Sequence, residues 1–166
     1  MSGPGTPIRC CAVEITIRAA DETDLAHLVR QRRAMFSEMG IGSETELNAM
    51  SESLDGYFRQ AIADGSYRAY LAADANGSVV AGGAIALPVL PPSPDNLSFH
   101  RAMILNVYTE PEWRRQGIAR KLMVVMIEWC RQQGFQYVDL HASKDGRSLY
   151  EQLGFTPTSE MRLRLR

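Results

Sequence analysis

The sequence predicts a mixed α/β fold, and three observations support this prediction. Segments rich in β-branched and aromatic residues alternate with segments of helical periodicity along the 166 residues. The pair Asn76-Gly77 lies between two apolar runs, which is one of the strongest short signals for a β-hairpin. Apolar residues recur every three or four positions over 117–133, so an amphipathic helix is expected there. We expect one domain over 13–166, preceded by a flexible Gly- and Pro-rich tail over 1–12.

The first third of the chain predicts one strand and two helices. Apolar and polar residues alternate over 13–18, which is typical of a half-buried strand. Asp21 is a candidate N-cap, and apolar residues at helical spacing then predict a helix over 22–38. A second helix is expected over about 47–63, because one side of it carries the apolar residues Leu47, Met50, Leu54, Tyr57, Phe58 and Ile62.

The middle of the chain predicts three strands. The hairpin signal joins a strand over 67–73 to a strand over 78–87, and this pair must be antiparallel. Four prolines fall within 88–95, so this segment cannot continue a sheet and is expected to form a stiff loop. A third strand, rich in Met, Ile, Leu, Val and Tyr, is expected over 102–109.

The last third predicts two helices and two strands. The amphipathic helix over 117–133 is followed by Gly134, which stands where a left-handed residue ends a helix. A strand over 135–141 and a short helix over 145–153 come next. Apolar residues and arginines alternate strictly over 160–165, so we expect a last strand with one face toward the core.

The composition excludes several classes of protein. With 18 basic and 19 acidic side chains, the molecule has no overall field that would recruit nucleic acid or an anionic membrane. No apolar run approaches the roughly 18 residues that a membrane-spanning helix needs. Cys10, Cys11 and Cys130 fit neither a disulfide framework nor a zinc site. We therefore expect a cytoplasmic protein with no metal, no nucleic-acid partner and no membrane partner.

The most informative segment connects a strand to the longest helix. The amides of the first helical turn have no acceptor within the helix and lie at the positive end of its dipole, so they form an anion site. Gly117 and Ala119 are small enough for a phosphate to approach the backbone. Because Arg114, Arg115 and Arg120 add positive charge, we expect a diphosphate ligand. The segment matches neither a Walker loop nor a dinucleotide-binding glycine motif.

Two motifs resemble those of the GCN5-related N-acetyltransferase (GNAT) family. Residues 114–119 read Arg-Arg-Gln-Gly-Ile-Ala and resemble the acetyl-CoA loop of the family, R/Q-x-x-G-x-G/A. Residues 149–155 read Leu-Tyr-Glu-Gln-Leu-Gly-Phe and resemble its second hallmark, which follows the loop by some thirty residues. The resemblance spans about 13–165 and is specific over 103–155.

The resemblance implies a fold and an activity. The implied fold is GNAT-like, with a mixed, mostly antiparallel sheet of six to seven strands, splayed near 107–110, and helices on both faces. The implied activity is direct transfer of the acetyl group of acetyl-CoA, without a metal, to a primary amine of a small molecule or peptide. Tyr150 matches the family tyrosine that protonates the leaving thiolate, and Ser143 stands where the family often has a cofactor-binding Asn. The positions assigned to the cofactor are Val107, Tyr108, Thr109, Arg114, Arg115, Gln116, Gly117, Ile118, Ala119, Arg120 and Ser143.

The acceptor side is less constrained. The attacking amine must lose a proton, and Glu110 is the nearest carboxylate to the reacting strand in sequence, with His100, His141 and Glu160 as alternatives. Acceptor selection is expected to depend on 36–50 and 88–100. Three glutamates in the first of these segments favour a cationic amine; they are Glu38, Glu44 and Glu46.

Three further readings remain open. A catalytically silent relative would bind acetyl-CoA as a sensor or act as a protein-interaction module. A longer acyl group is an alternative donor. A homodimer is a further expectation, because the family often pairs through exposed strands.

Overall fold

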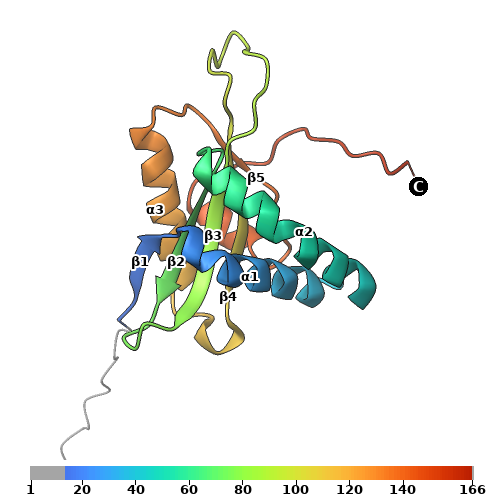
Figure 1. Cartoon of the computed structure of the whole chain (residues 1–166). Helices are drawn as coiled ribbons and strands as arrows, with labels where there is room; N and C mark the ends of the chain where they lie inside the picture. The colour runs from blue at the N-terminus through green and yellow to red at the C-terminus, as the bar shows by residue number, and fades with distance from the viewer. Residues whose placement is uncertain (1–13, 166) are drawn as a thin grey trace, which may run out of the picture.

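A five-stranded mixed sheet lies at the centre of the computed structural model, which describes residues 14–165 (Figure 1). Its neighbouring strands follow chain order and are β1 (Thr16–Ala19), β2 (Tyr67–Ala73), β3 (Val79–Ala86), β4 (Ala102–Thr109) and β5 (Val138–Leu140). The first four pair antiparallel, and β5 pairs parallel to β4. This confirms the predicted mixed, mostly antiparallel sheet. The tail predicted over 1–12 lies outside the described residues.

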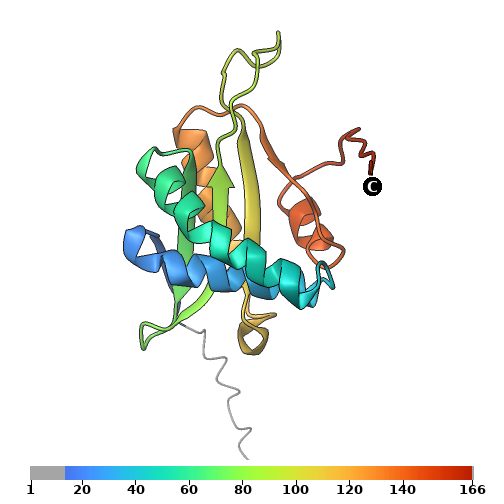
Figure 2. The same cartoon turned by 45° about the vertical axis from the view of Figure 1, so that its right-hand side comes forward.

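The helices cover both faces of the sheet, as predicted. One face is covered by α1 (Leu25–Glu38) and α2 (Glu44–Ala63), and the other by α3 (Ile118–Gln132). The short α4 (Arg147–Gln152) packs beside β5 and joins the α3 side of the core (Figure 2). Among residues 14–165, no helix has the length and apolar content needed to cross a membrane.

Two adjacent glycines in β3 let the helices approach the sheet closely from opposite sides. A Cβ atom at Gly82 would lie 2.2 Å from Oε1 of Gln31 in α1. A Cβ atom at Gly83 would lie 2.9 Å from the terminal methyl carbon of Met126 in α3. Both distances are shorter than real Cβ contacts, so a side chain at either position would require Gln31 or Met126 to move, and glycine leaves both in place. The hairpin turn before β3 forms as predicted, with Gly77 at a φ of 83°.

The sheet has fewer strands than the predicted six to seven, because the segment expected to form the last strand does not pair. Within the described residues, the sheet ends at β5, and 160–165 runs away from the body of the molecule (Figure 1). Met161, Leu163 and Leu165 are 80–94% exposed. Alternation of apolar residues predicts a strand only if a partner edge is present, and β5 offers an edge of only three residues.

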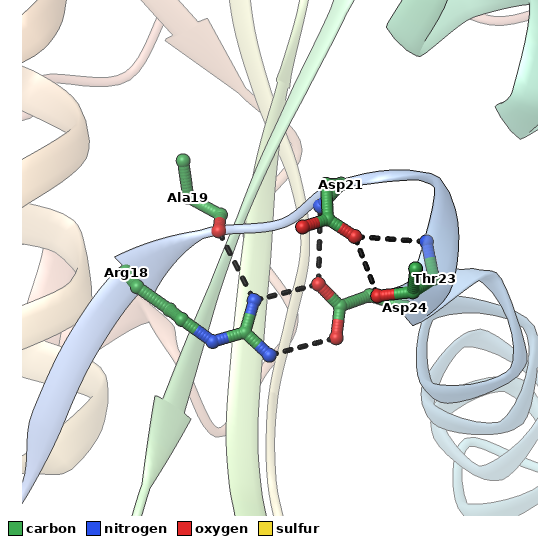
Figure 3. Close-up of polar contacts among 5 residues, drawn as sticks. All are labelled: Arg18, Ala19, Asp21, Thr23 and Asp24. Atoms are coloured by element: carbon green, nitrogen blue, oxygen red, sulfur yellow. Dashed lines mark hydrogen bonds and ion pairs between the residues drawn. The ribbon is translucent and has the colours of Figure 1, made fainter.

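A buried carboxylate fixes the entry of the chain into α1 (Figure 3). Both oxygens of Asp24 accept hydrogen bonds from the guanidinium of Arg18, at 2.6 and 2.8 Å. Oδ2 of Asp24 also accepts from the backbone amide of Asp21, whose own carboxylate caps the amide of Thr23 at 2.8 Å. The chain turns from β1 into helix through this network, so one side chain supports both elements.

Replacing Asp24 by Ala is expected to lower the free energy of unfolding by about 2 kcal/mol, because a buried charge-assisted pair and a helix cap are lost together. The hydrogen bonds from Arg18 lower the pKa of Asp24 below its usual value. The stabilisation is therefore complete above about pH 5 and is lost as the pH falls through the lowered pKa. Urea unfolding at pH 7 and pH 3 measures both effects.

The matched control is Asp55→Ala, which removes the exposed pair with Arg59 in α2. Exposed pairs of this kind contribute less than about 0.5 kcal/mol. An Asp24→Ala protein as stable as the Asp55→Ala protein would show that the network in Figure 3 does not stabilise the fold.

Candidate functional site

A β-bulge interrupts β4 at the centre of the sheet. Tyr108 pairs with Gly82 and Leu105 pairs with Ala84, so Gly83 faces two residues of β4, one of which is Asn106. Asn106 has a φ of 59°, a left-handed conformation that Asn adopts more readily than most residues. The bulge bends β4 at the point where it parts from β5.

The second half of β4 has one free edge. Pairing with β5 covers only Ala102 to Ile104, and no described strand pairs with 107–109 on that side. The sheet is therefore splayed beside the residues where the sequence predicts it. An extended molecule has access here to unpaired backbone groups, as an added strand would.

The loop after β4 turns its backbone amides toward open space. Arg115 and Gly117 both have left-handed φ values, 61° and 77°. Gly117 is the N-cap of α3, makes no side-chain cap, and its carbonyl accepts the first helical bond, from Lys121. Among the described residues, no backbone carbonyl accepts from the amides of 115–120. A Cβ atom at Gly117 would meet nothing within 4 Å, so the space beside this residue of the loop is open. This arrangement fits a diphosphate.

Two of the three arginines predicted to add positive charge to this loop contact other parts of the molecule. The guanidinium of Arg114 turns away to α1, where it lies 2.6 Å from the carboxylate of Glu38, and its Nε donates to the carbonyl of Thr109. The positive charge of Arg114 is therefore paired with a carboxylate of α1. Nη1 of Arg120 lies 3.4 Å from Oε1 of Gln152, which places the start of α3 beside α4.

Tyr108 forms part of the same contact with α1. Its hydroxyl donates to Glu38 at 2.9 Å. Burial, together with this hydrogen bond to a carboxylate, raises the pKa of Tyr108 to about 12. The hydroxyl therefore stays protonated at neutral pH and holds the carboxylate in place.

Tyr150 lies in α4, half-buried against the α3 side of the core. Its ring meets Phe155 edge-on, with centroids 6.1 Å apart, and a Cβ atom at Gly146 would lie 2.8 Å from the ring. Burial raises the pKa of Tyr150. None of the hydrogen bonds among the described residues involves its hydroxyl. Oγ of Ser143 accepts from the amide of Gly146 at 3.1 Å, a hydrogen bond within the turn that precedes α4.

The four candidate bases lie in three different places. Glu110 follows β4 and faces α1, with Oε1 2.6 Å from Arg30. His141 and Glu160 lie 2.8 Å apart and line an open groove of about 1050 Å³, which Tyr150 also lines. His100 is exposed on the loop that projects beyond the sheet (Figure 2).

The three glutamates that favoured a cationic acceptor are all engaged. Glu38 is held by Arg114 and Tyr108, as described above. Glu44 pairs with Arg33 at 2.6 Å. Glu46 closes the capping box of α2 with Ser43. Two of the three carboxylates are therefore paired with arginines, and the third is hydrogen-bonded to neutral groups of Ser43. A cationic acceptor stays a prediction.

Comparisons with known proteins assign the family. The profile of the acetyltransferase (GNAT) family matches residues 34–155. The chain belongs to the GNAT family. It is 29% identical over 138 residues to the uncharacterized N-acetyltransferase YjgM of Escherichia coli (strain K12), covering 81% of this chain and 76% of that protein.

Solved GNAT structures resemble this one closely. A GCN5-related N-acetyltransferase from Ralstonia eutropha JMP134 is 31% identical and superposes with a TM-score of 0.84, covering 92% of this chain and 99% of that one. A "predicted acetyltransferase" from Clostridium acetobutylicum, crystallised with acetyl-CoA, is 29% identical with a TM-score of 0.83, covering 92% and 97%. The resemblance found in the sequence motifs is thereby confirmed at the level of family and fold.

The sequence analysis missed one polar cluster of this GNAT protein. Nδ2 of Asn106 donates to the hydroxyl of Tyr67 at 2.7 Å, and its Oδ1 accepts from Nη1 of Arg32. Burial raises the pKa of Tyr67, so its hydroxyl stays protonated. The available signal was a polar Asn within an apolar strand, opposite the pair Gly82-Gly83. Among residues 14–165, no three His, Cys, Asp or Glu side chains gather to hold a metal ion.

Proposed function

We propose that this protein transfers the acetyl group of acetyl-CoA to a primary amine. The observation that carries the proposal is the row of unpaired amides over 115–120, which adjoins the free edge of β4. Coenzyme A has a diphosphate at the distance of one extended arm from its thiol, so a single molecule can use both features. The Clostridium relative crystallised with acetyl-CoA supports this donor.

The chain provides three functions for this reaction. The amides of 115–120 hold the diphosphate, and the backbone of 107–109 holds the extended arm and polarises the carbonyl oxygen through an amide near Thr109. Acetyl-CoA supplies the acetyl group as an activated thioester. The hydroxyl of Tyr150 donates a proton to the departing sulfur, and its raised pKa keeps that proton available at neutral pH.

Glu110 is the proposed proton acceptor for the amine, directly or through water. The Glu110 side chain is 20% exposed at the end of β4, and Arg30 lies 2.6 Å from its Oε1. Replacing Glu110 by Gln should lower kcat/KM at pH 7. The variant should recover part of this loss at pH 9, where more of the amine is already neutral. The control His141→Gln should keep the profile of the unmodified protein. If only the His141→Gln change altered the dependence of kcat/KM on pH, the proton acceptor would be His141 in the groove and not Glu110.

Two measurements test the proposed function. Calorimetry should detect one CoA site per chain, and release of free thiol from acetyl-CoA should depend on an added amine. Binding without thiol release over a broad panel of amines would favour a silent sensor, and the absence of binding would refute the proposal. The same assay with butyryl-CoA tests a longer donor.

We also propose that the protein forms a homodimer through 160–165. The exposed apolar side chains of this segment and the short open edge of β5 support this proposal. Light scattering should give twice the chain mass for the full protein and one chain mass after truncation at Thr158. A full-length monomer would contradict it.

A further inference from the structure

Seven charged side chains lie along α1 and its contacts with the start of α2 and the end of β4; we call them the α1 charge strip. Its members are Arg30, Arg32, Arg33, Glu38, Glu44, Glu110 and Arg114. Each of its three carboxylates pairs with one arginine at 2.6 Å, namely Glu110 with Arg30, Glu44 with Arg33 and Glu38 with Arg114. Arg32 is the one member of the strip that forms no ion pair with a carboxylate within residues 14–165. Among these seven side chains, Arg32 is therefore the one charge without an oppositely charged partner.

Neutral groups hold the guanidinium of Arg32 in place. It stacks on the ring of Phe36, 4.8 Å from the ring centroid, and Nη1 donates to Asn106. Its Nε is buried and has no hydrogen-bond partner. A buried N–H of a charged group without an acceptor is costly, and in a native protein it calls for a ligand or an equivalent explanation.

A second unpaired donor lies beside Arg32 on the same turn of α1. Gln31 is only 3% exposed, and its Nε2 has no partner. Gln31 and Asn106 line one small cavity over the bulge, together with Leu28, Tyr67, Gly83 and Ala84. Arg32 donates to Asn106 through Nη1, and Gln31 lines the cavity that Asn106 also lines, so both unpaired N–H donors belong to residues that lie against Asn106. Unpaired donors of this kind recognise a group that can only accept hydrogen bonds.

The position of these donors relates them to the proposed reaction. Asn106 immediately precedes the stretch 107–109 that would hold the arm of acetyl-CoA, so Arg32 lies beside the place that an acceptor amine must reach. An anionic group a few bonds from the reacting nitrogen would meet the guanidinium there. Such a pair would satisfy the buried Nε and neutralise the strip.

We propose that Arg32 binds an anionic group of the acceptor, so that the acceptor is a small amine carrying a carboxylate or phosphonate near its nitrogen. The proposal rests on the proposed function and gives the acceptor a charge opposite to that suggested by the glutamates of 36–50. Amino acids and aminoalkylphosphonates share this chemistry. Arg32 contacts the acceptor as a binding residue and takes no part in proton transfer.

The test uses the full protein with matched acceptors and an inert ligand. The acceptors are an amino acid, its amide, the corresponding aminoalkylphosphonate and a diamine of equal length. The inert ligand is the acid that lacks the amine, titrated by calorimetry in the presence of CoA. The variants are Arg32→Gln, Arg32→Lys and, as control, Arg59→Gln, which changes an exposed arginine of α2.

We expect the unmodified protein to prefer an anionic acceptor over the amide and the diamine. Comparison of the amino acid with the aminoalkylphosphonate identifies which anion it takes. Arg32→Gln should lower kcat/KM for that acceptor by on the order of 10²-fold, mainly through KM, with Arg32→Lys intermediate. The amide rates and the CoA affinity should change less than about threefold, and Arg59→Gln should change nothing. The inert acid should bind the unmodified protein and lose affinity in Arg32→Gln.

Other outcomes overturn the inference. They are a preference for the diamine, or an equal loss with acid and amide in both Arg32 variants, which is the mark of a structural role. If no amine releases thiol, the proposed function fails, and the inert acid still decides for or against anion binding at Arg32. Failure of that acid to bind refutes the site even if transfer to other amines occurs.

Discussion

Replacing Tyr150 by Phe is expected to lower kcat for amine-dependent thiol release by about 10²-fold, the lower end of what a positioned proton donor contributes. The ring keeps its contact with Phe155, because only the hydroxyl is removed. The dissociation constant of CoA should stay within about twofold. Release of free thiol at saturating acetyl-CoA and amine measures the rate, and calorimetry measures the binding.

The pH dependence of this role follows from burial. Burial raises the pKa of Tyr150 above its usual value of about 10, so the acid form persists across pH 6 to 9. Deprotonation of Tyr150 should therefore cause no fall in rate between pH 6 and pH 9. The control is Tyr137→Phe, an exposed tyrosine that lines the same groove and has no assigned role. A Tyr150→Phe protein as active as this control would exclude the proton-donor role.

Replacing Gly117 by Val is expected to raise the dissociation constant of CoA at least about tenfold, which corresponds to about 1.4 kcal/mol. Gly117 has a φ of 77°, and a side chain there costs about 1–2 kcal/mol of backbone strain, more for a branched one. The new side chain would also occupy open space at Gly117, within the loop whose amides are proposed to hold the diphosphate. Isothermal titration with CoA measures the loss directly.

Gly134 provides a matched control at the opposite end of α3. It has a φ of 81°, and a Cβ atom there would also meet nothing within 4 Å. Gly134→Val should therefore cost a similar amount of stability in urea unfolding and leave CoA binding unchanged. Equal CoA affinity in the Gly117 and Gly134 variants would contradict the assignment of the diphosphate to this loop.

Local pattern was enough to predict most elements of the fold. The strands 67–73 and 102–109 form with the predicted bounds, and the hairpin between β2 and β3 forms at Asn76-Gly77. The glycine that begins α3 takes the left-handed conformation that an anion loop needs. These features depend on interactions between residues a few positions apart, so the sequence alone contains them.

Local pattern was wrong about the last strand. The alternation over 160–165 is as regular as that of any strand in the chain, yet the segment is exposed. A strand forms only against a partner edge, and the availability of that edge is a property of the assembled sheet. The same limit hid the bulge at Asn106, which exists because Gly83 of β3 faces two residues of β4.

The sequence by itself determined the family, the order of the elements and the loop that presents its amides at the start of α3. Only the tertiary structure decided which charges remain unmatched. Glu38 meets Arg114 across 76 positions of the chain, and Arg32 meets Asn106 across 74. Charge pairing depends on which side chains folding brings together, and a count of glutamates in one segment does not contain that information. For this reason the sequence suggested a cationic acceptor, whereas the folded chain leaves an arginine beside the bulge.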